Sequence, residues 1–204
     1  MTTERSVTSA TGRTATGRTA VLRTDGAFVV ASTVALAGVG ALQAAGGLPW
    51  VVPGDESVLT EFYDSLPGWA QLAFGAWQAG AVLLGLVLPA AAIARWGRRG
   101  AGGAAVRAAL APYALVLLWQ VVLEATLARV FFPGIVVLTG VVYTAHRLRQ
   151  LQRSRRVFAA SPAEPAFPTR AGNAVRALLV AGTVFWSLNL AFLLTTQLPQ
   201  IIHR

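Results

Sequence analysis

Long apolar runs alternate with clusters of arginine along this chain of 204 residues. Five runs rich in Ala, Val, Leu and Gly cover residues 26–46, 69–94, 108–126, 133–146 and 177–196. A helix rises about 1.5 Å per residue, so about 20 apolar residues cross a hydrocarbon layer of about 30 Å. Inside lipid, backbone polar groups must be satisfied within the segment, which favours helices. The sequence therefore predicts an all-α, polytopic transmembrane helix bundle with about five spans.

Charged residues make up only 12% of the chain, against roughly 25% in soluble domains. The formal net charge of +9 would suit a nucleic-acid partner. Arginines gathered on cytoplasmic loops account for that charge without one. We therefore expect the lipid bilayer as the partner, with a second copy or another membrane protein as further candidates, and no nucleic acid.

The arginines also predict the orientation. All seventeen basic residues are arginine: four precede residue 26, four lie in 95–107 and seven in 146–176. The opposite side receives Arg129 and, at the far terminus, Arg204. Basic loops stay in the cytoplasm, so the N-terminus is predicted to be cytoplasmic and the C-terminus outside. We expect a multi-pass protein of the plasma (inner) membrane of a bacterium.

The segments outside the apolar runs differ in composition. Residues 1–25 are polar, contain a tandem five-residue repeat at 11–20, and are predicted to be a disordered cytoplasmic tail. Residues 26–196 then form a single transmembrane domain. Its parts outside the bilayer, together with the chain end, are predicted to be an acidic external loop at 47–68, a basic cytoplasmic segment at 146–176 and a short external tail at 197–204.

Two features of the topology stay open from the sequence. The first apolar run could be a cleavable signal peptide, although its length and its long polar leader favour a retained span. Residues 108–146 suit two passes broken near Pro133, or a re-entrant hairpin. Pro89 lies near the end of the second run, where a kink is tolerable if neighbouring helices cover the freed carbonyl.

Reaction chemistry finds little support in the sequence. The chain has no cysteine, and its two histidines, His146 and His203, lie at a predicted membrane edge and near the terminus. No phosphate loop, zinc-binding helix motif or serine elbow occurs. We predict no catalytic residue, no metal site and no cofactor, and hence a protein that is not an enzyme.

Polar residues inside spans are costly and are candidates for function. Counting 1.5 Å per residue from the predicted membrane edges places three amides, on three different spans, at one depth in the outer half. The predicted intramembrane cluster consists of Gln78, Gln120, Glu124 and Asn189, with Glu124 somewhat further out. Three tryptophans lie beside this layer: Trp77, Trp119 and Trp186.

This layer has two interpretations. In the functional one, amides and indoles line a polar pocket that opens outward, Glu124 accepts a proton or binds a cation, and Arg129 is its interfacial partner. In the structural one, the amides hydrogen-bond between helices as packing contacts, worth about 0.6–2 kcal/mol each.

A second candidate site is the basic run that follows the fourth span. Clusters of basic residues beside a span can bind anionic lipid headgroups. The residues predicted to make this contact are Arg147, Arg149, Arg153, Arg155 and Arg156. Setting the membrane topology is the simpler role for the same charges.

These observations favour a non-catalytic multi-pass protein that acts by helix packing, partner interaction or oligomerisation. The alternative is a small transporter or channel that uses the polar layer around Glu124. A lipid-modifying membrane enzyme is the third and weakest candidate. Its weakness is that a single intramembrane carboxylate offers little acid–base chemistry.

Overall fold

A computed structural model describes residues 7–45, 64, 66–98, 100–130, 133–160 and 168–199. Within these ranges the chain is helical and has no strand, as predicted. The helices are α1 (Val7–Ala44), α3 (Gly68–Val82), the π-helical turn η1 (Leu83–Val87), α4 (Leu88–Trp96), α5 (Gly100–Val130), α6 (Pro133–Ala159), α7 (Thr169–Phe192) and a second π-helical turn, η2 (Leu193–Gln197).

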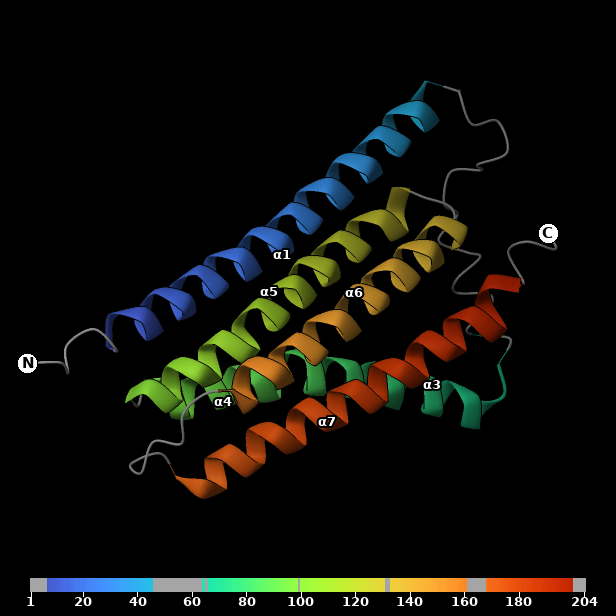
Figure 1. Cartoon of the computed structure of the whole chain (residues 1–204). Coiled ribbons are helices and arrows are strands. Elements are labelled where there is room, and N and C mark those ends of the chain that lie inside the picture. The colour runs from blue at the N-terminus through green and yellow to red at the C-terminus, as the bar shows by residue number, and fades with distance from the viewer. Residues whose placement is uncertain are drawn as a thin grey trace, which may run out of the picture.

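The helices lie side by side in one elongated bundle (Figure 1). α5 and α6 run antiparallel and pack closely; α7 and the α3–α4 helix cover one side of this pair and α1 lies along the other. The core sits where α4, α5, α6 and α7 meet, and its fully buried members include Val106, Leu110, Leu151, Val175 and Leu179. The ends of α4 and α6 and the starts of α5 and α7 gather at one end of the bundle.

Four helical stretches are long and apolar enough to cross a membrane: Arg23–Leu42, Gly68–Trp96, Gly100–Leu123 and Thr169–Gln197. They correspond to four of the five predicted spans. The fifth, 133–146, is the first half of α6, whose second half carries the basic run and lowers the average hydropathy. α6 has 27 residues, or about 40 Å of helix, and it lies along α5 as a full-length partner (Figure 1).

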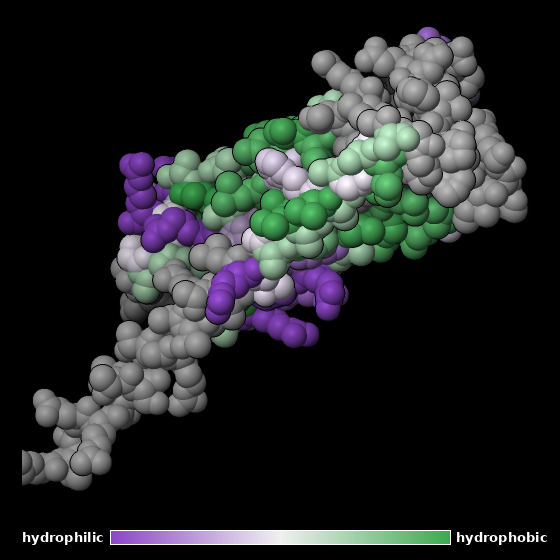
Figure 2. Space-filling view, turned by 90° about the horizontal axis from the view of Figure 1, so that it is seen from above, coloured by the Kyte–Doolittle hydropathy of each residue, from purple (hydrophilic) through white to green (hydrophobic). Residues whose placement is uncertain are grey.

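The outer surface of the bundle is apolar. Leu72 is 77% exposed and Val34 is 65% exposed, and large aliphatic side chains of every long helix are similarly open. Figure 2 shows a mainly hydrophobic face over the middle of the bundle, with hydrophilic residues gathered toward its left end and lower edge. Soluble monomers rarely expose apolar patches on this scale, so the surface fits a membrane-embedded protein.

The structure corrects the predicted extent of the N-terminal tail. α1 begins at Val7, so residues 7–25, including the tandem repeat, are helical rather than disordered. Extending an existing helix needs no new nucleus, and no proline interrupts these residues. Most of the predicted acidic loop, residues 161–167 and the end of the external tail lie outside the described residues.

Pro89 explains the first π-helical turn. A proline has no backbone N–H, so it cannot donate to the carbonyl of Gly85, four residues earlier. Directly before it, the Leu88 N–H donates to the Leu83 carbonyl, which is a five-residue step. The helix is therefore widened at 83–87, and buried Gly85 lies against Leu117 of α5.

A glycine near the α4–α5 turn allows close packing that a methyl group would prevent. A Cβ at Gly103 would lie 2.5 Å from the Trp96 carbonyl oxygen and 2.8 Å from that of Gly97. We expect Gly103→Ala to lower the free energy of unfolding by about 1–3 kcal/mol, because backbone atoms must move. Gly172→Ala, where nothing lies within 4 Å, is the matched control. Thermal unfolding in nanodiscs measures both; equal midpoints for the two variants would contradict this packing.

Candidate functional site: a polar cavity between the helices

A cavity of about 450 Å³ lies between α3, α5, α6, α7 and η2. Its walls are largely aliphatic and aromatic, with Val121, Val137 and Phe192 among them. Polar side chains from all these elements also reach it: Gln78, Gln120, Thr144, Arg147, Asn189 and Gln197. The cavity opens to the surface of the bundle, since Gln78, Val121 and Phe192 of its lining are exposed, and a partly polar cavity of this size is a candidate binding site.

Arg147 of α6 forms part of the cavity wall and is completely buried. Its Nη2 group donates a hydrogen bond to Oε1 of Gln120 on α5. Its guanidinium carbon lies 3.9 Å from the ring centroid of Trp186 on α7. A cation over an indole face is stabilised by the ring quadrupole, more so when water is excluded. One side chain thus connects three helices.

The indole N–H of Trp186 makes a further contact, at the edge of the ring. Its Nε1–H donates to the hydroxyl oxygen of Tyr113 on α5, at 2.6 Å, and both rings are almost fully buried. Phe185 packs edge-on against it, with 5.0 Å between ring centroids. The indole face is therefore held in position for the guanidinium.

Asn189 of α7 makes a second connection between helices. Its side-chain oxygen accepts from Nε1 of Trp77 on α3, at 2.9 Å, and its Nδ2 donates to Oγ1 of Thr144 on α6, at 3.2 Å. Trp77 in turn stacks on Phe185, with ring centroids 4.4 Å apart. These contacts orient the carboxamide of Asn189, which also lines the cavity.

The structure brings three of the predicted cluster residues to one place. Gln78, Gln120 and Asn189 all line this cavity, as do Trp77 and Trp186. Trp119 does not line it and is 36% exposed. The side chains of Glu124 and Arg129 lie outside the described residues, so their roles as ligand and interfacial partner stay predictions.

The predicted lipid-contact run divides in two. Arg149, Arg155 and Arg156 are exposed, and Arg153 is partly buried and lies 3.6 Å from Asp25. For Arg147 the prediction is wrong, because a fully buried guanidinium does not reach lipid headgroups.

Helical spacing is the signal that could have identified Arg147. It lies four residues from both Tyr143 and Leu151, and all three are buried on one face of α6. Thr144, which the sequence did not single out, is 1% exposed on the same side of the helix.

A separate cluster joins α1 to α6. Nε2 of His146 lies 3.2 Å from Oδ1 of Asp25, and its ring stacks on Phe28 with centroids 3.7 Å apart. One turn further along α1, the hydroxyls of Ser32 and Tyr143 are hydrogen-bonded at 2.7 Å. In the part of the chain that the structure describes, no group of three His, Cys, Asp or Glu residues could hold a metal ion.

Most of the chain is similar to a known protein family. The model of a protein family described as "Domain of unknown function (DUF7733)" matches residues 66–204. This chain belongs to that family. The matched region contains every helix that lines the cavity and leaves α1 outside. Neither a curated protein nor a solved structure matches the chain.

Arg147 and Arg149 provide a matched test of the buried contacts. Lysine keeps the charge, but it has no planar fork to stack on Trp186 while reaching Gln120. We expect Arg147→Lys to lower the free energy of unfolding by about 1–3 kcal/mol and Arg149→Lys, on the exposed face, to leave it within about 0.5 kcal/mol. Tryptophan-monitored melting in nanodiscs gives both values, and an unchanged midpoint for Arg147→Lys would rule out the described stacking.

Proposed function

We propose that the protein is a non-catalytic, multi-pass membrane protein that binds a small amphipathic molecule in this cavity. The ligand class combines a hydrogen-bonding, oxygen-containing head with a short apolar body. The observation that supports this proposal is the cavity itself, about 450 Å³ in volume, with polar groups from α3, α5, α6, α7 and η2 set among apolar walls.

Packing alone does not account for the cavity. The bonds of Asn189 and Arg147 do connect helices, as the structural interpretation of the amides requires. The space opens to the bundle surface, so a lipid chain would fill it with apolar contacts but would offer no hydrogen bond to the amides of its lining. The volume lies within the range of about 300–1,000 Å³ that is usual for ligand pockets.

The side-chain chemistry favours binding over reaction. The described lining offers amides, one hydroxyl and one guanidinium, and it includes no carboxylate, histidine or cysteine that could act as base or nucleophile. The polar groups of Gln120, Arg147 and Asn189 are held by neighbouring side chains, so little ordering accompanies ligand entry.

The proposal includes an orientation in the plasma membrane of a bacterium, with the arginine-bearing ends of the helices in the cytoplasm. The exposed arginines of α4, α5, α6 and α7 lie where those helices gather at one end of the bundle, which supports a common side. Anionic headgroups on that side are the proposed partners of Arg149, Arg155 and Arg156.

The absence of cysteine makes this orientation directly testable. In intact spheroplasts, a membrane-impermeant maleimide is expected to label Ser57→Cys in the acidic segment but not Arg155→Cys in the basic segment. Permeabilised membranes should label both. The reverse pattern would invert the proposed orientation, and labelling of both in intact spheroplasts would contradict a common side.

A cavity-filling substitution tests ligand binding. Gly140 lines the cavity, and a Cβ there would make only an ordinary contact, 3.7 Å from Leu193. We expect nanodisc-embedded protein to retain 1-octanoylglycerol in native mass spectrometry, and Gly140→Leu to weaken retention at least about tenfold, or about 1.4 kcal/mol.

The matched control is Gly75→Leu, at an exposed glycine of α3 with nothing within 4 Å. Octanoate serves as a second probe, which distinguishes a neutral from an ionised head. Equal retention by the wild type and Gly140→Leu would overturn the binding function and leave helix packing as the role of the polar layer.

A further inference from the structure

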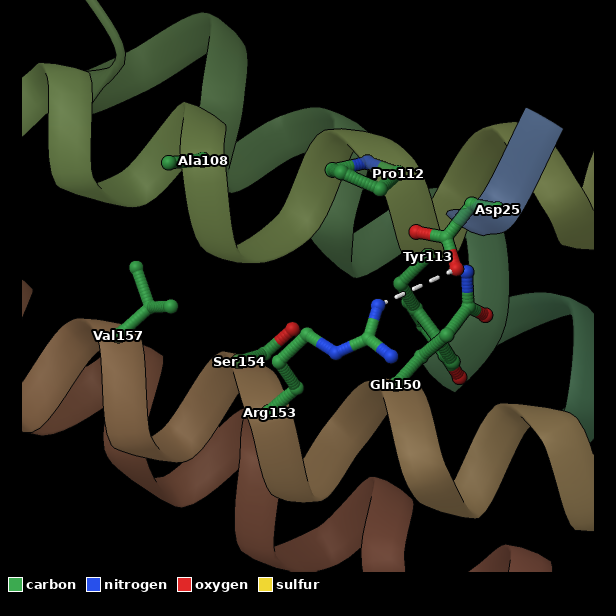
Figure 3. Close-up of a pocket in the computed structure, with 8 residues that line it drawn as sticks. All are labelled: Asp25, Ala108, Pro112, Tyr113, Gln150, Arg153, Ser154 and Val157. Atoms are coloured by element: carbon green, nitrogen blue, oxygen red, sulfur yellow. Dashed lines mark ion pairs between the residues drawn. The ribbon is translucent and has the colours of Figure 1, made fainter. Parts of the chain in front are cut away.

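A second, much smaller polar space lies between α1, α5 and α6 (Figure 3). Its volume is about 10 Å³, and it is lined by Asp25, Ala108, Pro112, Tyr113, Gln150, Arg153, Ser154 and Val157. In Figure 3, Gln150 and Arg153 rise from α6 toward Asp25 on α1, with Pro112 of α5 beside them. Nothing in the proposed ligand binding uses this place.

Pro112 leaves a backbone acceptor at this space. It lies inside α5, and without an N–H it cannot donate to the carbonyl of Ala108, four residues earlier. The next carbonyl, that of Ala109, accepts a hydrogen bond of 2.6 Å from the hydroxyl of Ser154 on α6. The α5 backbone is thus partly satisfied from α6, and Ala108, whose carbonyl lacks the usual donor from residue 112, lines the space.

Gln150 brings a buried amide to the same space. Its side chain is 97% buried, and neither its nitrogen nor its oxygen has a hydrogen-bond partner among the described residues. Burying an amide without partners costs free energy, so native proteins almost always satisfy such groups with protein or ordered water. The carboxylate of Asp25 and the guanidinium of Arg153 adjoin it.

We propose that this space is a binding site for one ordered water molecule. The water donates to the Ala108 carbonyl and the Gln150 oxygen, or to Asp25, and accepts from the Gln150 nitrogen or Arg153. A water needs a space of about 10–15 Å³ and two to four polar partners, and this space offers both.

The surrounding charges favour water over a sodium ion. Asp25, Ala108 and Gln150 provide oxygens, but the guanidinium of Arg153 lies 3.6 Å from the carboxylate and His146 lies 3.2 Å from it. A bound cation would meet these basic groups and the amide N–H donors. Water uses donors and acceptors together, which matches the mixed lining.

A water here would add to the polar contacts between α1 and the region that the family model matches. Asp25 comes from α1, outside the matched region, whereas Ala108 and Gln150 lie within it. Tyr113 borders the same space, and its hydroxyl accepts from Trp186 of the large cavity. The hydrogen-bonded pair of Tyr113 and Trp186 therefore connects the water site to the proposed ligand site.

The sign of a stability change tests the proposal. If the amide is buried dry, Gln150→Leu removes unsatisfied groups and raises the melting temperature. If water is bound, the substitution removes the amide that holds the water, and the remaining polar groups of the site lose hydrogen bonds. We expect the midpoint to fall by about 2–4 °C. Gln152→Leu, exposed two residues further along α6, controls for the change itself. A rise in the Gln150→Leu midpoint relative to this control would overturn the proposal.

X-ray hydroxyl-radical footprinting of the wild-type protein in nanodiscs gives an independent reading, because bound water generates radicals where it sits. We expect modification of Pro112 and Tyr113 well above that of Leu110, a fully buried neighbour on α5 that does not line the space. Gln150→Leu should reduce the modification at least threefold. Modification of Pro112 and Tyr113 at the level of Leu110, or unchanged in Gln150→Leu, would show that no water is bound by these groups. Adding sodium should leave the pattern unchanged; protection by sodium would replace water with a cation.

Discussion

The burial of one guanidinium constrains the arrangement of the bundle. A charge moved out of water is costly unless hydrogen bonds and neighbouring electron density compensate for it. For Arg147 the described compensation comes from Gln120 on α5 and the face of Trp186 on α7. Both contacts are directional, so a rotation or a shift of any of the three helices by one residue would break them. The identity of this side chain therefore fixes the register of α5, α6 and α7.

Directional contacts of a second side chain, Asn189, keep the cavity open. Aliphatic side chains alone would let the helices close together, because dispersion has no preferred direction. Asn189 instead holds Trp77 and Thr144 at set distances, so α3 and α6 stay apart at this level. The π-helical turn η2 begins directly after α7 and brings Leu193 and Gln197 to the cavity. Such turns often occur at functional sites, because they redirect side chains without ending the helix.

The sequence could predict which residues share a level along the bundle, but not the angle at which each one projects from its helix. The arginine clusters gave approximate edges, and counting residues from them placed Gln78, Gln120 and Asn189 at one level, where they line one cavity. Trp119 lies at the same depth but is 36% exposed, because it projects from another face of α5. Depth says nothing about which faces meet.

Arg147 shows that charge patterns in the sequence do not tell which arginines face the membrane edge and which face the core. The sequence predicts that the arginines after the fourth apolar run lie at the membrane edge, and Arg149 is exposed as this position requires. A helix presents each neighbour about 100° further round, so residues two apart can lie in the core and in solvent. The spacing Tyr143–Arg147–Leu151 carried that information, but only packing against α5 and α7 makes this face the interior.

The attachment of α1 follows a different physical rule from the rest of the bundle. Of the residues in its long apolar stretch, Arg23–Leu42, only 6% are buried, so apolar packing holds it weakly. Asp25, Phe28 and Ser32 follow one another at three- and four-residue steps, and each contacts α6. In lipid, apolar helix faces gain little by meeting, so these specific contacts determine which face of α1 packs against α6. The carboxylate of Asp25 is then the group whose satisfaction matters most, because Asp25 is almost buried and lines the same small space as Gln150.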